Sequence, residues 1–306
     1  MNALPSRPGD GSAPQATLVD AAGTRQVVGF YGTGPRRTFG AVHLPRGRAT
    51  AGVVICPALH SDFERTYRRD VLLGRTLCAQ GYAVHRFHYR GLGNSEGVPS
   101  DATFDTMRED ALLAAERLRG LADVQTVGFA GTRWGGLVAA SAAADHHGAP
   151  VVLWEPPIDT ARYFREAGRA RAVRDAKEGR QPTSWDSLLE DLQRSGSIDV
   201  LGYAIDEALY RGAAGRTLLG LLGSRPRPVL LVQLGRGRSL SADYRAVVDE
   251  YRRRGFEIET GLVEGEGAWW FVGGFWEPVE TRRSTSLLIE MTTAWIARWL
   301  SSSSTE

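Results

Sequence analysis

Short apolar runs alternate along the chain with longer amphipathic segments, and this alternation predicts an α/β protein. Runs rich in Val, Ile and Leu are typical of strands buried on both faces of a parallel sheet, whereas apolar residues repeating every three to four positions indicate helices. The expected strands are 52–57, 82–89, 126–130, 150–154, 228–233 and 256–263. The expected helices are 67–80, 103–118 (with Asp101 as its N-cap), 134–144, 242–254 and 284–300. Three earlier runs, 17–19, 26–31 and 38–44, predict antiparallel strands at one edge.

The alternation stops after Pro156 and Pro157, and residues 157–225 show an Arg-rich helical pattern without strands. This stretch has too few large apolar residues to form a core of its own. We therefore expect a helical cap over the carboxyl ends of the strands, where open α/β sheets bind ligands. The expected core comprises 16–156 and 226–300, with a disordered polar leader at 1–15 and a disordered tail at 301–306.

Composition excludes several other classes of protein. The chain has 306 residues, of which 42% are hydrophobic and 24% charged, as in ordinary globular domains. No apolar run approaches the ~20 residues of a membrane span. A net charge of +2 does not favour nucleic-acid binding, although 36 of the 37 basic residues are arginine, which we attribute to coding bias. Cys56 and Cys78 lie in apolar segments, and no signal-peptide pattern opens the chain, so we expect a cytoplasmic protein without disulfides.

Three stretches resemble the α/β-hydrolase superfamily. Residues 88–97 (HYRGLGNSEG) resemble its D-x-R-G-x-G-x-S turn, with His88 in place of Asp. Residues 128–136 (GFAGTRWGG) match the frame of its nucleophile elbow G-x-S-x-G, with Arg133 at the nucleophile position. Residues 151–157 (VVLWEPP) resemble a W-(E/Q)-P segment of hydrolase-like proteins found beside exosortase and exopolysaccharide genes, which also carry arginine at the elbow. The resemblance covers about 52–276 and implies an α/β-hydrolase fold.

The remaining catalytic positions of that superfamily are also changed. The acid is expected in the loop after 228–233, where the sequence reads LGRGR, and the histidine in the loop after 256–263, where it reads EGEGAWWF. No histidine follows His147. Arginine offers only donors and stays protonated, so it cannot be an acyl nucleophile. The sequence therefore excludes the ordinary serine-esterase mechanism.

Arg133 is predicted at the start of a helix, where the helix dipole disfavours a cation, so a negative partner is expected. The partner is either a substrate anion or a protein carboxylate, for which Asp62, Glu155, Glu264 and Glu266 are candidates. In the first case Arg133 clamps a ligand. In the second, it closes a pocket that has lost its catalytic function.

Other candidate residues surround this position. His60, expected in a loop, is either the general acid or base or a histidine that only hydrogen-bonds the turn. The aromatic residues Trp269 and Trp270 either line the pocket or pack in the core. Cys56 and Ser61 are the candidates for a displaced nucleophile. No metal-ligand spacing and no dinucleotide fingerprint is present, so we expect neither metal nor cofactor.

The leading hypothesis is a biosynthetic enzyme that acts on an anionic acyl-type substrate, either a small molecule or linked to an acyl carrier, by transfer, cyclisation or elimination. The expected catalytic residues are Arg133 as anion clamp, with His60 or Glu155 moving the proton. The expected substrate-binding residues are Leu59, Asp62, Trp134, Glu266, Trp269 and Trp270, with the Leu59 and Trp134 backbone N–H groups polarising a carbonyl. The alternatives are an inactive scaffold or ligand-binding module, and an esterase or thioesterase with a displaced nucleophile.

Overall fold

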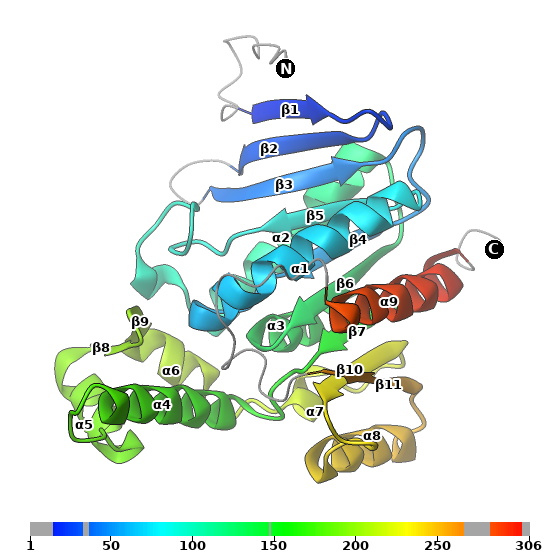
Figure 1. Ribbon diagram of the computed structural model, residues 1–306. Coiled ribbons are helices and arrows are strands. Elements are labelled where there is room, and N and C mark those ends of the chain that lie inside the picture. The colour runs from blue at the N-terminus through cyan, green and yellow to red at the C-terminus, as the bar shows by residue number, and fades with distance from the viewer. Residues whose placement is uncertain (1–14, 33–36, 147, 266–281, 302–306) are drawn as a thin grey trace.

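A mixed sheet forms the centre of the molecule. The computed structural model describes residues 15–32, 37–146, 148–265 and 282–301. In this part of the chain nine strands form one sheet in the order β1-β2-β3-β5-β4-β6-β7-β10-β11 (Figure 1). Their bounds are β1 Gln15–Val19, β2 Arg25–Tyr31, β3 Thr38–Leu44, β4 Gly52–Cys56, β5 Ala83–Phe87, β6 Val127–Thr132, β7 Val151–Trp154, β10 Val229–Gly235 and β11 Ile258–Glu264.

The strand directions confirm the predicted division of the sheet. β1, β2 and β3 pair antiparallel with one another, and β3 pairs antiparallel with β5. The five pairs β5–β4, β4–β6, β6–β7, β7–β10 and β10–β11 are all parallel. The carboxyl ends of the parallel strands therefore meet at one edge of the sheet.

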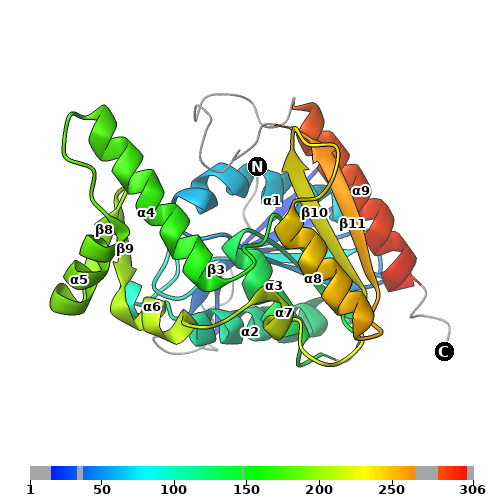
Figure 2. The same cartoon turned by 90° about the horizontal axis from the view of Figure 1, so that it is seen from below.

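Helices cover both faces. The helices outside the insertion described below are α1 His60–Ala79, α2 Phe104–Ala122, α3 Trp134–Ala143, α8 Ala242–Arg253 and α9 Arg283–Ser301. α1 and α9 pack on one face, and α2, α3 and α8 pack on the other (Figures 1 and 2). This two-sided covering explains why the central strands read as continuous apolar runs. In β4, Val53 and Ile55 join the core beneath α1 and α9, whereas Val54 and Cys56 join the core beneath α2 and α3.

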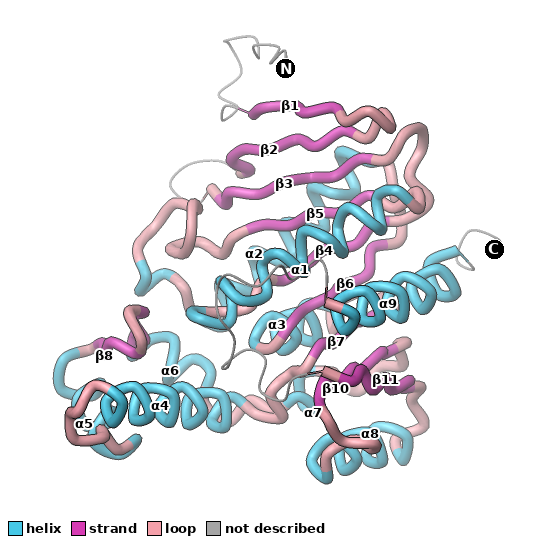
Figure 3. Tube along the Cα trace, viewed as in Figure 1, coloured by secondary structure: helices cyan, strands magenta, loops and turns pink. Residues whose placement is uncertain are grey.

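Most of an insertion between β7 and β10 stands at one side of the sheet, and its last short helix packs against α3 and α8 (Figure 2). Its elements are α4 Thr160–Lys177, α5 Trp185–Ser195, β8 Ser197–Val200, β9 Tyr203–Asp206, α6 Glu207–Ala213 and α7 Leu218–Leu221. The expectation that this stretch contains no strand is wrong, because β8 and β9 form an antiparallel hairpin away from the main sheet (Figure 3). Each strand has only four residues, too few for alternation to show in the sequence, and Leu201 and Gly202 make the turn with positive φ.

Two helix starts differ from the sequence prediction. α1 begins at His60, not at residue 67, so His60 and Asp62 lie in its first turn and not in a loop. The N-cap of α2 is Thr103, whose hydroxyl accepts the N–H of Thr106, whereas Asp101 ends a short 3₁₀ turn. The first turn of α1 contains the polar residues His60, Ser61 and Asp62, so the apolar period does not reveal where this helix begins. None of the helices in the described part of the chain is long and apolar enough to span a membrane.

Candidate functional site

The turn between β6 and α3 presents Arg133 at the carboxyl edge of the sheet. Arg133 has φ 52° and ψ −121°, a strained backbone conformation for a residue with a side chain. Two glycines make the turn possible. A Cβ on Gly131 would lie 2.1 Å from the carbonyl oxygen of Gly135, and a Cβ on Gly135 would lie 2.2 Å from that of Cys56. Close packing of strand and helix therefore fixes the backbone from which Arg133 projects.

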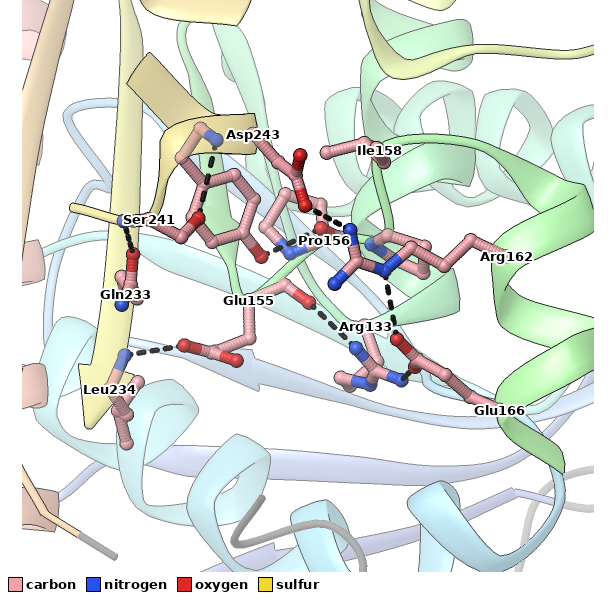
Figure 4. A pocket seen from close by; sticks show the side chains of 12 residues that line it. Arg133, Glu155, Pro156, Ile158, Arg162, Glu166, Gln233, Leu234, Ser241 and Asp243 are labelled. Carbon is pink, nitrogen blue, oxygen red and sulfur yellow. Dashed lines mark hydrogen bonds and ion pairs between the residues drawn. The ribbon is translucent and has the colours of Figure 1, made fainter. Parts of the chain in front are cut away.

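The Arg133 side chain is held by protein groups from three elements. Its Nε donates to Asp62 Oδ2 at 3.3 Å, and its Nη1 donates to the backbone carbonyl of Glu155 at 3.4 Å. Its Nη2 donates to Glu166 Oε2 (Figure 4), and its guanidinium lies 5.9 Å from the ring centre of Tyr163. Burial lowers the pKa of Arg133, but the charges of Asp62 and Glu166 outweigh burial and raise the pKa above its usual value. Arg133 is therefore a permanent cation, only 3% exposed.

Arg133 belongs to a chain of alternating charges that we call the charge network: Asp62, Arg133, Glu166, Arg162 and Asp243. Glu166 Oε1 accepts from Arg162 Nε at 3.1 Å, and Arg162 Nη1 donates to Asp243 Oδ2. The network joins the start of α1, the turn after β6, the inserted helix α4 and the start of α8. Burial raises the pKa of Asp62 to about 6, although Arg133 opposes this shift.

Glu155 places a buried carboxyl beside the network. It follows β7 with φ 51°, and its Oε1 accepts the N–H of Leu234 at 2.6 Å (Figure 4). Burial raises its pKa to about 7, against the opposing effects of the Leu234 hydrogen bond and of Arg133. Glu155 is only 4% exposed. Because its pKa is about 7, its carboxyl gains or loses a proton near neutral pH. This is the range in which a general acid or base works best.

Two adjoining cavities meet at Arg133. The larger, about 190 Å³, is lined by Arg133, Glu155, Arg162, Glu166 and Tyr244 among others. The smaller, about 40 Å³, is lined by His60, Ser61, Asp62 and Tyr163 among others, and shares Arg133 and Glu166 with the first. Burial lowers the pKa of His60 to about 4, so this histidine is neutral at pH 7. Arg133 thus lies between Glu155, which lines the larger cavity, and Asp62 and His60, which line the smaller one.

The remaining predicted residues fall into three groups. The side chains of Leu59 and Trp134 are buried, and the Trp134 ring N–H donates to Met107 Sδ, so neither side chain lines these cavities. Glu264, a predicted partner of Arg133, is exposed at the end of β11. Glu266, Trp269 and Trp270 lie outside the described residues.

Sequence reasoning missed Glu166, Arg162 and Asp243. The sequence signal for Glu166 and Arg162 is their i,i+4 spacing, which favours an ion pair on any helix. This spacing does not indicate that Glu166 also binds Arg133. Asp243 is the first carboxylate after β10, which by itself indicates no partner. Its position beside Arg162 depends on how α4 and α8 lie in the fold.

The candidates for a displaced nucleophile lie at the end of β4 and the start of α1. Cys56 is fully buried, and burial raises the pKa of its thiol well above the usual value, which suppresses the reactive thiolate. Ser61 lines the smaller cavity with the neutral His60. Thr132, next to Arg133, is buried and hydrogen-bonds Asp70.

Comparisons with known proteins agree on the fold. A family model for serine aminopeptidases of the S33 group matches residues 47–188, and no curated protein matches the chain by sequence. Est1E from Butyrivibrio proteoclasticus with bound ferulic acid is similar with a TM-score of 0.63 at 16% identity, covering 89% of this chain and 98% of its own. An esterase from Pyrococcus furiosus is similar with a TM-score of 0.54 at 15% identity, covering 94% and 91%. Dienelactone hydrolase from Anabaena variabilis is similar with a TM-score of 0.53 at 13% identity, covering 90% and 98%.

Proposed function

We propose that this chain, which has an α/β-hydrolase fold, binds an anionic acyl-type small molecule at the carboxyl edge of its sheet and forms no acyl-serine intermediate there. The observation that carries the proposal is Arg133, a buried cation that lines both cavities at the turn where relatives of this fold present a nucleophile. A planar guanidinium recognises a carboxylate through two parallel hydrogen bonds. The insertion, on this proposal, serves as a cap over the ligand.

The groups around Arg133 support an acyl ligand with a carbonyl beside its anion. Leu59 and Trp134 stand at the starts of α1 and α3, where the first backbone N–H groups of a helix lack partners within it. Such N–H groups polarise a carbonyl in many acyl-transfer sites. The larger cavity offers the neighbouring space, and its wall includes the carboxyl of Glu155.

Glu155 favours a chemical step over binding alone. Its carboxyl, with a pKa of about 7, holds or releases a proton at neutral pH next to the space for the ligand. Transfer, cyclisation and elimination all require one proton to move, and none requires a serine nucleophile. His60 is a weaker candidate for this role, because a pKa of about 4 leaves it uncharged at pH 7 and makes it a weak base.

A ligand-binding module without catalysis is the second candidate. The observation in its favour is that Asp62 and Glu166 already bind the guanidinium of Arg133, as expected of a site that has lost its reaction. An esterase or thioesterase with Ser61 as a displaced nucleophile is a third. Labelling by a fluorophosphonate that disappears in Ser61→Ala would support this third candidate, and absence of labelling would exclude it.

Binding of matched carboxylates and amides tests the proposal. Butyrate and butyramide have the same shape and differ in charge, so calorimetry should show that butyrate binds and butyramide does not. Arg133→Gln should abolish the difference. Arg174→Gln is the control, because it removes an arginine of α4 whose partner Glu178 lies at the surface. Equal binding of butyrate by the wild type and Arg133→Gln would show that Arg133 is not the anion site.

Anionic thioesters separate the enzyme from the binding module. Succinyl- and glutaryl-N-acetylcysteamine carry both a free carboxylate and an activated acyl group. An enzyme should consume them, and Glu155→Gln should bind them but leave them intact, as mass spectrometry of the mixture would show. Binding by the wild type without any consumption would favour the module.

A further inference from the structure

We infer that Glu166 occupies the position of the ligand's carboxylate, and that the ligand is a monocarboxylate which replaces Glu166 between Arg133 and Arg162. This inference rests on the proposed function. It adds the class of ligand, and it adds that the Glu166 side chain competes with the ligand for the site. Its starting point is the way in which the Glu166 carboxylate is bound. One oxygen accepts from Arg133 Nη2 and the other accepts from Arg162 Nε at 3.1 Å, so one carboxylate bridges two guanidinium groups.

The two carboxylates on Arg133 are not equally replaceable. Asp62 is a short side chain in the core helix α1, and its side chain is 8% exposed. Glu166 is a longer side chain on the inserted helix α4, and its side chain is 27% exposed. Moving Asp62 would leave a buried charge, whereas Glu166 can rotate into water at a small cost in free energy. Asp62 therefore keeps Arg133 in place, and Glu166 is the group that a ligand displaces.

The charge balance of the site favours a monocarboxylate over a phosphate. The charge network contains the three carboxylates Asp62, Glu166 and Asp243 and the two guanidinium groups of Arg133 and Arg162, for a net charge of −1. A monocarboxylate that replaces Glu166 restores the same local charge. A phosphate dianion would add a further negative charge beside Asp62, Asp243 and Glu155, which like-charge repulsion disfavours.

The larger cavity accommodates the uncharged part of such a ligand. Its volume is about 190 Å³, and a cavity of roughly 150 Å³ is enough to bind benzene. The cavity extends from the Glu166 carboxylate to Glu155, Gln233 and Tyr244. A short acyl group attached to the carboxylate therefore reaches Glu155, whose protonated carboxyl can donate to an oxygen of the ligand.

The test removes the charge of Glu166 and keeps its shape. Butyrate, butyramide and inorganic phosphate are titrated by calorimetry into the full-length wild type, Glu166→Gln and the control Glu178→Gln, which changes an exposed glutamate that follows the same helix. We expect Glu166→Gln to bind butyrate about tenfold more tightly than the wild type, the factor expected if Glu166 fills the site about nine-tenths of the time. Glu178→Gln should match the wild type. Glu166→Ala provides a second variant with the same expected direction, and circular dichroism verifies the fold of each.

The outcomes separate this inference from the proposed function. If the wild type binds butyrate through Arg133 but Glu166→Gln binds it no more tightly, the inference is wrong and the proposed function stands. If neither protein binds butyrate, both are wrong. If Glu166→Gln gains affinity for phosphate and not for butyrate, the site exists but the class of ligand is wrong.

Discussion

Arg133 and Glu166, 33 positions apart in sequence, form an ion pair that ties the turn after β6 to the inserted helix α4. Arg162 on the same helix extends the connection to Asp243 at the start of α8. The insertion is thereby attached to the sheet core through charges as well as through the packing of Tyr163 and Phe164 against Trp134. Substitutions in the network should therefore affect stability as well as ligand binding.

Arg133→Gln should destabilise the fold in a pH-dependent way. The variant leaves Asp62 buried without its cation, and loss of one partner of a buried pair costs about 3–5 kcal/mol. The loss should be largest at pH 8 and smaller at pH 5, because Asp62, whose pKa is already about 6 beside Arg133, can then take up a proton. Urea denaturation at the two pH values measures the difference. Arg174→Gln, which breaks an exposed pair, should cost less than about 1 kcal/mol at both.

Glu155 should make stability fall as the pH rises. Its pKa is raised from 4.5 to about 7, so between these values the folded protein keeps a proton that the unfolded chain releases. The stabilisation is complete below pH 4.5 and is lost through pH 7, at up to about 1.4 kcal/mol per pH unit. Arg133, Glu166 and Tyr244 are the charged or titratable groups that act on it.

Glu155→Gln isolates this contribution, because glutamine has no proton to lose. The free energy of unfolding of the wild type minus that of the variant should decrease between pH 4.5 and pH 7 and then level off. A difference that stays constant over this range would mean that Glu155 titrates normally.

Gly135→Ala should prevent the turn after β6 from forming. The new methyl carbon would lie 2.2 Å from the carbonyl oxygen of Cys56 and 2.6 Å from that of Pro57, and both are backbone atoms of the core. We expect a loss of more than about 3 kcal/mol or no soluble protein. Gly120→Ala, in α2, meets no atom within 4 Å and should stabilise the helix by up to about 1 kcal/mol. Thermal unfolding compares the two alanine variants.

Asp110→Asn should destabilise the loop that follows β5. Asp110 accepts the backbone N–H and the Nε of Arg90, both at 2.8 Å, and its side chain is fully buried. Replacing the carboxylate leaves the Arg90 charge without its main partner, at a cost of about 3–5 kcal/mol in chemical denaturation. Asp123→Asn, which affects a pair whose side chains are both more than 80% exposed, should change the free energy of unfolding by less than about 1 kcal/mol. Similar losses in the two variants would contradict this assignment.

The sheet could be predicted from the sequence because its signals are local. The apolar run at 52–57 predicts a buried strand, and the glycines at 131 and 135 predict a close approach of strand and helix. Neither prediction needs information about residues far away in the sequence. The start of α1 at His60 could not be predicted, because His60 begins its helix with φ 52° and Ser61 and Asp62 are polar.

The candidate site was predictable in part for the same reason. Arg133 and Glu155 end neighbouring strands, so the strand order alone brings them together. Asp62 was predicted among four possible partners of Arg133, and the structure selects it. Glu166 and Asp243 come from helices whose relative placement no local pattern encodes, so their contacts with Arg133 and Arg162 emerge only from the packed structure.

The backbone of residue 133 is fixed independently of the side chain that it carries. Gly131, Gly135 and the hydrogen bond from the Arg133 N–H to the Trp154 carbonyl at 2.9 Å determine its conformation, and none of these contacts uses the guanidinium. A different side chain would project from the same point, provided that Asp62 and Glu166 were neutralised with it. The fold therefore holds the backbone at position 133 in one conformation whichever side chain is attached. A serine at position 133 would be the starting point for engineering a hydrolase.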